Sequence, residues 1–552
     1  MVKMPSYASS MSLSQTITDP IEGGVLPPAA SHALFTHFML EMNAKWEYIL
    51  DPHLDTHDDV RRRSALLFAT VLFCASKFAS HMGQRPSSSL VPTTDPFLQS
   101  RLCSIARSLA IRAFAEGDRS IEAMQALYCM VCWKDADDDV SYLHSGYAFR
   151  VLHDLDLDGE GDDGGRARAR RTRTWLALFR QDRQQSLFFV RRAARNLGDD
   201  DPPFIGDLDA WLKMPHALPQ DFVAGCSADV RRVQSKMRAM VLRASPAMLP
   251  CLLDLMDSEM GRWRTKWKGH MSGDGWMHVE GEASVDHRLL YPGRAHLDTL
   301  MGLWEHSVRL NVASSIFRQA LMASVASSLR SHEQVPPPWG AGFDITTMAD
   351  VVSPDAPGLA SSVEGALGTL QNMLAFPEDD LRRAPDSVLL LGPNAALFLC
   401  LLLCLPCDGI LGPSFQRTAI SLIRDVSRHV RQSVRSPQDT VNLHAAYLDS
   451  LVDLLAPASA DHPPPSMQGD SGQSNVDELQ HLHMDPDALN IDQTALQAAQ
   501  VLAGGMGSTY DNREEDDSIF SLTGEPDQTL HMQSLANLLD TNCFWEMPPL
   551  NT

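Results

Sequence analysis

Two cysteine pairs have the spacing of metal ligands, Cys129-x-x-Cys132 and Cys404-x-x-Cys407. A structural zinc ion needs about four ligands within tetrahedral reach. The pairs lie far apart in the chain, and each is embedded in an apolar segment. We therefore interpret them as buried structural thiols, and we expect no cofactor and no metal site in this chain.

Two acidic runs have the composition of metal-binding segments. Residues 154–159 begin like a calcium loop, but Gly165 stands at the twelfth position, where a bidentate glutamate is needed. Residues 135–139 contain four aspartates, as in the magnesium sites of all-helical terpenoid cyclases, but no second such motif follows. We interpret the first run as an acidic helix end and loop, and the second as a solvated turn.

The densest basic run could carry a nuclear import signal or contact phosphates. Its members are Arg166, Arg168, Arg170, Arg171 and Arg173. The alternative is that these arginines form the exposed start of the helix that contains Trp175.

A second basic segment, Arg262–Lys268, alternates bases with Trp263 and Trp267, as in proteins that bind single-stranded nucleic acid. However, these tryptophans continue a helical apolar series. Its earlier members are Leu252, Met256 and Met260. This spacing predicts that both tryptophans face the core.

Catalytic motifs are missing from the sequence. It contains no Gly-rich phosphate loop, no Gly-x-Ser-x-Gly elbow and no His-Glu-x-x-His, and its 20 histidines lack ligand spacing. We therefore expect a protein that is not an enzyme.

The elements that must position these residues are amphipathic helices, because apolar residues recur at spacings of three and four. The predicted helical segments are 31–50, 60–78, 98–114, 121–133, 142–157, 171–189, 300–329, 362–374 and 415–455. Alternating, β-branched runs are almost absent, so few strands are expected. The sequence predicts an all-α fold: one large multi-helix domain over residues 29–456, with disordered tails at 1–28 and 457–552.

Net charge is concentrated in the last part of the chain. The 552 residues contain 46 Lys and Arg against 69 Asp and Glu, a net charge of −23. Residues 461–552 contain a single base, Arg513, among many acids. Such a segment cannot bury enough apolar surface to fold alone. The ten dispersed cysteines favour free thiols in a reducing compartment.

Within this acidic tail, apolar residues gather near the end of the chain. Leu535, Leu538 and Leu539 are spaced as one face of a helix, and Phe544 and Trp545 extend the set. Negative charge around apolar groups suits a segment that folds on a basic-rimmed groove. We predict a transactivation element that binds a coactivator; the alternative is a helix that docks onto the body's own groove.

The most apolar stretch of the chain runs from Val388 to Cys407. Gly392, Pro393 and Asn394 interrupt it and Pro406 ends it, which leaves about half of the ~20 residues that a membrane span needs. We expect a buried core helix and no membrane. The first residues lack the apolar core of a secretory signal, so an intracellular protein is expected.

Several segments together resemble the fungal-specific transcription factor domain, the helical middle homology region of Zn2Cys6 zinc-cluster regulators. The matching residues are Leu50-Asp51-Pro52 with 60–78, Ile121–Trp133, Gly146-x-Ala148-x-Arg150, Arg173-Thr174-Trp175, Asp182-Arg183 and Ser186. The clear resemblance covers about residues 31–195. Where the family usually continues with Gly-Arg-Pro, this chain has residues 190–193, Val-Arg-Arg-Ala. Trp133 and Trp175 should be core residues, with Arg150 and Arg173 paired to carboxylates near the helix surface.

The resemblance implies a nuclear regulator of RNA polymerase II transcription, with a helical regulatory and effector-sensing body. Its partners would be transcription coactivators or other regulators, and homodimer formation is left open. The six-cysteine cluster with which the family binds zinc and DNA does not occur. DNA binding would therefore need a partner or a missing zinc cluster. Either the chain is a regulator without that cluster, or the sequence begins downstream of it.

Two other classes of protein remain as alternatives. One is a helical adaptor or scaffold unrelated to transcription. The other is an all-helical, magnesium-dependent enzyme similar to terpenoid cyclases, against which the missing second metal motif argues.

Overall fold

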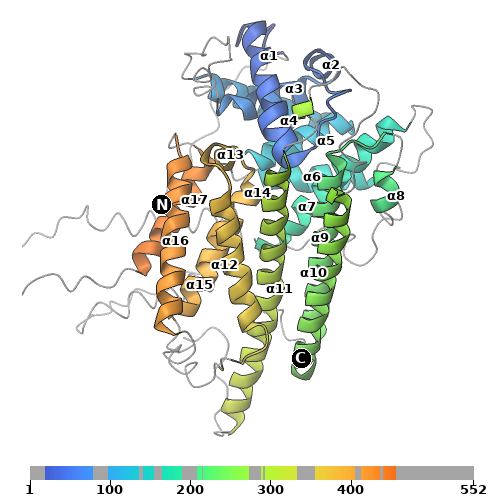
Figure 1. The fold of residues 1–552 in the computed structure, drawn as a ribbon. Coiled ribbons are helices and arrows are strands. Elements are labelled where there is room, and N and C mark those ends of the chain that lie inside the picture. Colours follow the sequence, from blue (N-terminus) through green and yellow to red (C-terminus); the bar gives the residue numbers. More distant parts are fainter. Residues whose placement is uncertain are drawn as a thin grey trace, which may run out of the picture.

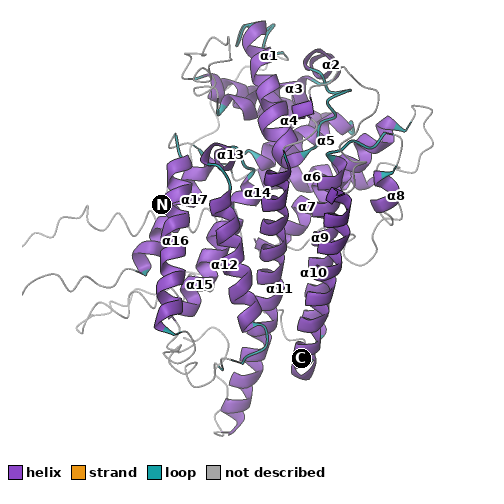
Figure 2. Cartoon of the chain, viewed as in Figure 1, coloured by secondary structure: helices purple, strands orange, loops and turns teal. Residues whose placement is uncertain are grey.

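A computed structural model gives the fold of the chain. The structure describes residues 19–78, 97–135, 138, 141–154, 165–188, 208–213, 216–272, 287–289, 293–331, 353, 355–404, 412–435 and 439–455. Every regular element in these ranges is a helix (Figure 2). The predicted all-α class is confirmed.

The helices fall into three groups along the chain. The first comprises α1 (Pro28–His37), the π-helix η1 (Phe38–Glu47), α2 (His57–Arg63), α3 (Ala65–Ser76), α4 (Leu98–Glu116), α5 (Ile121–Cys132), α6 (Ser141–Asp154) and α7 (Arg166–Phe188). The second comprises α8 (Leu208–Leu212), α9 (Asp221–Arg243), η5 (Pro246–Met248), α10 (Leu249–Ser272), η7 (His287–Leu289) and α11 (Arg294–Ser331). The third comprises α12 (Leu359–Ala375), α13 (Glu378–Arg382), α14 (Asp386–Leu389), α15 (Leu391–Cys404), α16 (Pro413–Ser433) and α17 (Thr440–Leu454).

The long helix α11 lies at the centre of the body. It packs against α12 on one side and against α9 and α10 on the other, and α15, α16 and α17 continue the layer beyond α12 (Figure 1). Helices α1 to α5 gather at one end of these long helices, and α7 joins them to α9. One connected apolar core runs through all three groups.

Local sequence signals fix several helix ends. Ser64 ends α2 and begins α3, where its hydroxyl accepts a hydrogen bond from the Leu67 backbone nitrogen at 3.2 Å. Ser120 precedes α5, and its hydroxyl accepts a hydrogen bond from the Ala123 backbone nitrogen. Such side-chain caps satisfy amides that have no partner inside the helix. Gly117 ends α4 with a φ of 66°, which glycine adopts without strain.

A close contact between the long helices α11 and α12 depends on a glycine. A Cβ atom on Gly365 of α12 would lie 2.6 Å from the backbone nitrogen of Leu310 on α11. No larger residue fits there without separating the helices. The backbones of α11 and α12 therefore touch directly.

The last part of the predicted N-terminal tail contacts the helical body. Val25 and Leu26 are buried, and the Asp19 carboxylate accepts a hydrogen bond from Arg61 of α2 at 2.6 Å. Residues 19–28 thus pack on the body through apolar burial and an ion pair. Residues 1–18 of the predicted N-terminal tail, and the whole predicted tail at 457–552, lie outside the described residues.

The tryptophans expected in the core are confirmed there. Trp133 is 3% exposed and donates a hydrogen bond to the Arg383 carbonyl oxygen at 3.0 Å, which joins α5 to the segment after α13. Trp175 is 1% exposed and stacks on Phe179. Trp263 and Trp267 are also buried, and Trp263 donates to the Cys226 carbonyl.

The apolar stretch around α15 is also buried. Asp386–Leu403 is long and apolar enough to cross a membrane, and 72% of it is buried inside the protein. This agrees with the predicted core helix.

Replacing Trp175 with alanine should lower the free energy of unfolding by ~3–5 kcal/mol, because it removes a buried aromatic side chain and leaves a cavity. Urea unfolding of the full chain measures this change. Leu143→Ala, at a side chain that is 65% exposed, is the control and should change stability by less than ~0.5 kcal/mol. Equal midpoints for both variants would contradict the core assignment.

Candidate functional site

A groove opens between α7, α9 and the start of α10, with a volume of about 960 Å³. Helix α9 forms its longest wall, α7 contributes Phe179 and Arg183, and the turn around η5 closes one end. The lining residues are Phe179, Arg183, Asp229, Arg232, Val233, Ser235, Lys236, Ala239, Met240, Arg243, Ala244, Ser245, Met248 and Leu252.

The charges of the groove are strongly biased. Its lining contains four basic side chains and one acidic side chain, Asp229, in a chain that is acidic overall. Asp229 is already engaged, because it accepts a hydrogen bond from the Trp267 indole at 2.9 Å. The Arg183 guanidinium lies over the Phe179 ring at 5.3 Å. The groove therefore favours an anionic group beside an apolar one.

The helical spacing of α9 places these residues together. Arg232, Lys236 and Arg243 follow one another at intervals of about one or two turns, with Met240 between them. Sequence reasoning did not single out this groove. The basic stripe on α9 was the available signal, but only the fold shows that Phe179 and Met248 lie opposite it.

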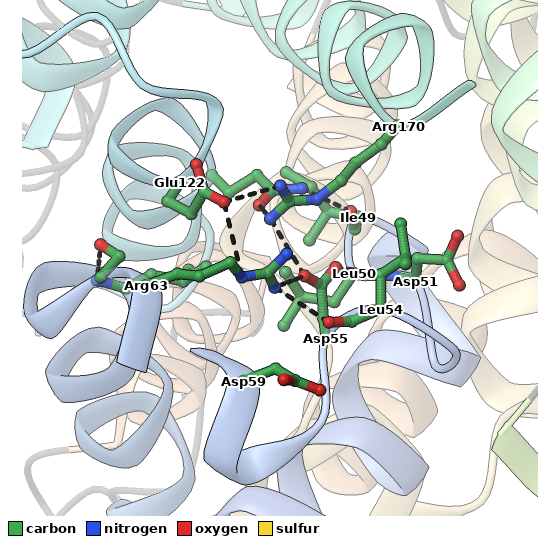
Figure 3. A network of polar contacts seen from close by, with 12 residues as sticks. Ile49, Leu50, Asp51, Leu54, Asp55, Asp59, Arg63, Glu122 and Arg170 are labelled. Atoms are coloured by element: carbon green, nitrogen blue, oxygen red, sulfur yellow. Dashed lines mark hydrogen bonds and ion pairs between the residues drawn. The ribbon is translucent and has the colours of Figure 1, made fainter. Parts of the chain in front are cut away.

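Near the start of α7, a network of charged side chains joins this helix to the first helices (Figure 3). Arg170 contacts the Asp55 carboxylate at 3.0 Å and Glu122 at 2.8 Å, and it donates to Gln125. Arg63 of α2 pairs with the same Asp55. Two arginines and two carboxylates thus link α2, α5 and α7.

Arg173 lies deeper in the same helix and is fully buried. It forms a bidentate pair with Asp221, one contact of which measures 2.9 Å, and Asp51 lies 3.7 Å away. Burial alone would lower the pKa of Arg173, but the charge and hydrogen bonds of Asp221, together with the charges of Asp51 and Asp55, raise the pKa above its ordinary value. Asp221 begins α9 and also accepts from the Leu218 amide at 2.8 Å, so the pair fixes where α9 starts.

These contacts correct two predictions. Arg173 pairs inside the core, not near the helix surface, because α9 covers α7 there. Arg170 is also buried, so these two arginines are not part of an accessible import signal. Arg168 is exposed, and Arg166 and Arg171 are partly exposed, as is usual for a helix start. Arg150, expected to pair with a carboxylate, is exposed.

The acidic run at 135–139 is also less solvated than predicted. Asp135 pairs with Lys77 at 2.8 Å, and Asp138 pairs with Arg107 at 3.0 Å. Both carboxylates are therefore engaged by bases of neighbouring helices. Among the described residues of this run, nothing presents a free pair of carboxylates to a metal.

The thiols of the first cysteine pair are buried. Burial raises the pKa of both Cys129 and Cys132 well above the usual range. Neutral thiols are poor nucleophiles and poor metal ligands. The side chains of Cys404 and Cys407 lie outside the described residues.

One cluster has metal-ligating side chains within reach of one another: His32, His57 and Asp58. The two imidazole rings are stacked, with centroids 3.5 Å apart and planes 21° apart, so their in-plane lone pairs do not converge on one point. Both His57 nitrogens have hydrogen-bond partners at 2.7 Å, the Ser31 hydroxyl and the Asp58 carboxylate. The geometry suits a hydrogen-bonded joint between α1 and α2 better than a metal site.

Another polar cluster fastens η1 to α11 and α13. Lys45 donates to the Asp380 carboxylate at 2.6 Å, and His296 lies 3.6 Å from its second oxygen. Burial would raise the pKa of Asp380, but the hydrogen bonds and charges of His296 and Lys45 lower it to about 2.

The candidate transactivation residues Leu535, Leu538, Leu539, Phe544 and Trp545 lie outside the described residues, as does most of the acidic run at 154–159. Neither prediction is tested by the structure.

Comparison with known proteins gives one distant relative. No family model matches the chain, and no solved structure matches it. The chain is 24% identical over 276 residues to Protein priB of Lentinula edodes. That stretch covers 48% of this chain and 43% of priB, so the chain spans less than half of that relative's length. The match assigns neither a family nor a function.

The ion pair between Arg173 of α7 and Asp221 of α9 predicts that the stability losses of variants at these two residues are not additive. Arg173→Met should cost ~3–5 kcal/mol of stability, because it leaves the Asp221 carboxylate buried without its partner. Adding Asp221→Asn removes that charge, so the double variant should be ~1–3 kcal/mol more stable than the sum of the single losses predicts. Urea unfolding of the three variants measures the coupling. Strictly additive losses would mean that the two residues act independently.

The low pKa of Asp380 predicts a pH-dependent contribution to stability. Because this pKa lies below that of an aspartate in the unfolded chain, ionised Asp380 stabilises the fold above pH ~4, and the effect is lost as the pH falls toward 2. At pH 7, Asp380→Asn should cost ~2.5 kcal/mol, and the difference from wild type should shrink below pH ~4.

Unfolding curves recorded from pH 7 down to pH 3 test this, with Asp379→Asn at the exposed neighbour as control. A difference for Asp380→Asn that stays constant with pH would show that the carboxylate charge is not the cause.

Proposed function

We propose that the chain is a nuclear regulator of RNA polymerase II transcription, in which the helical body controls an acidic activating segment. The observation that carries the proposal is that the segments behind the family resemblance pack against one another. Gln125 of α5 donates to the Ile49 carbonyl at 3.0 Å and to the Thr174 hydroxyl at 3.3 Å. Arg173 of α7 faces Asp51.

Those contacts support the resemblance for a physical reason. Residues 50–52, 121–133 and 173–175 are far apart in the sequence, yet they form one buried framework. A domain shared between proteins keeps such framework residues together because losing one partner leaves a buried polar group unpaired. In this proposal, DNA is reached through a partner or through a zinc cluster that the sequence lacks, and no zinc is assigned to this chain.

A helical adaptor is the second candidate, and the groove along α9 favours it. Apolar side chains with a basic rim suit an acidic amphipathic peptide from any partner. The two proposals differ in whether residues 505–552 activate transcription. A cyclase-like enzyme gains no support, since Asp135 and Asp138 are paired with bases.

Fusing residues 505–552 to a heterologous DNA-binding domain should activate a reporter gene. Alanine at four apolar positions should reduce that output several-fold, because these side chains would bind the coactivator. The four positions are Leu538, Leu539, Phe544 and Trp545. Reporter transcript per fusion protein is the measurement.

A matched control carries the same number of alanines at apolar positions earlier in the segment. These positions are Tyr510, Ile519, Phe520 and Leu522. The control should retain most of the output. A wild-type fusion that is silent at normal abundance would reject the proposal and favour the adaptor.

A further inference from the structure

The groove along α9 leaves large apolar side chains in contact with solvent. Met240 is 37% exposed, and Met248 is 51% exposed on the turn opposite it. Exposed apolar groups gathered at one place mark an interaction surface, and methionines adapt to varied partners because their side chains are flexible.

The rim around these side chains has the opposite charge to the chain as a whole. Lys236 is 54% exposed and Arg243 is exposed, so both can reach a bound group. Lys236 has an acidic neighbour, Glu259 at 3.0 Å, whereas Asp229 is held by Trp267 and Lys266. The groove therefore fits an occupant that is acidic and amphipathic.

We propose that the occupant is the chain's own segment 530–546. When this segment is docked in the groove, its apolar side chains are inaccessible to other proteins. Leu535, Leu538 and Leu539 have the spacing of one helical face, and Asp540 and Glu546 lie close to them in the sequence. The segment is acidic and amphipathic, and the groove is basic and apolar. The charges of the two are opposite, and both have apolar side chains that can pack together.

The tether makes this docking favourable. Roughly 80 residues separate Leu455, the last described residue, from Leu535, and such a length can extend to roughly 260 Å. A body of this size is about 55 Å across, so the segment can reach the groove. Tethering gives an effective concentration on the order of 1 mM. An intrinsic Kd of roughly 0.1 mM would then keep about nine-tenths of the segment docked.

The regulatory consequence rests on the proposed function, whereas the docking itself does not. The same leucines cannot face the groove and a coactivator at once. Docking therefore silences the segment, and a partner or ligand that takes the groove releases it. Binding by such a competitor shifts the equilibrium only by the difference in its affinity for the two states.

Cys543 reports on docking in the native full chain, because it stands between Leu539 and Phe544. With nine-tenths of the segment docked, alkylation of Cys543 should be about tenfold slower than in a free peptide of residues 505–552. Peptide mass spectrometry after timed iodoacetamide treatment gives the rate. Arg243→Glu with Met248→Ser should restore most of the peptide rate, since both changes are at exposed positions of the groove.

Arg424→Glu is the matched control, because it makes the same charge change at an exposed position of α16. It should leave the slow rate unchanged, whereas Leu538→Ala with Leu539→Ala should raise the rate as the groove variant does.

Equal rates in chain and peptide would overturn the proposal, and so would protection that the groove variant leaves intact. If the slow alkylation of Cys543 became fast when the protein is diluted, the segment in the groove would come from a second copy of the chain, and docking within one chain would be rejected. The assay involves no transcription and the reporter fusion contains no body, so docking and activation can fail separately.

Discussion

Burial removes water from the Arg173 guanidinium, and the Asp221 carboxylate takes the place of that water. The pair joins the middle of α7 to the first residue of α9 and so fixes how the two helices meet. Helix α9 forms the longest wall of the groove, and α7 supplies Phe179 opposite it. The shape of the candidate site therefore follows from an ion pair that is not part of the groove lining.

The fold class could be predicted because apolar spacing along the chain reports directly on helical packing. The burial of Trp263 and Trp267 followed from the same periodicity. The buried ion pair of Arg173 could not be predicted from apolar spacing, since its position beside Arg171 and Arg170 suggests a solvated basic run. Only the approach of α9, far along the chain, determines which arginines of that helix lose their water.

The candidate groove was harder to predict for a related reason. A basic stripe on α9 is visible in the sequence, but an exposed stripe and a groove wall have the same pattern. The turn at η5 brings Met248 to face α9, and nothing in its local sequence indicates that direction. The acidic end of the chain, in contrast, is evident from composition alone, and its proposed roles as activator and as occupant of the groove use the same residues.

The glycine contact between α11 and α12 has a mechanical consequence. Helices usually slide past one another on a layer of side chains that change rotamers in small steps. At Gly365 that layer is missing, and the α12 backbone rests on Leu310 of α11. Sliding would drive backbone into backbone, so the two helices should move as one rigid strut. A shift of α11 caused by a change at the groove wall would then carry α12 with it and reach α15 and α16, on the opposite side of the body.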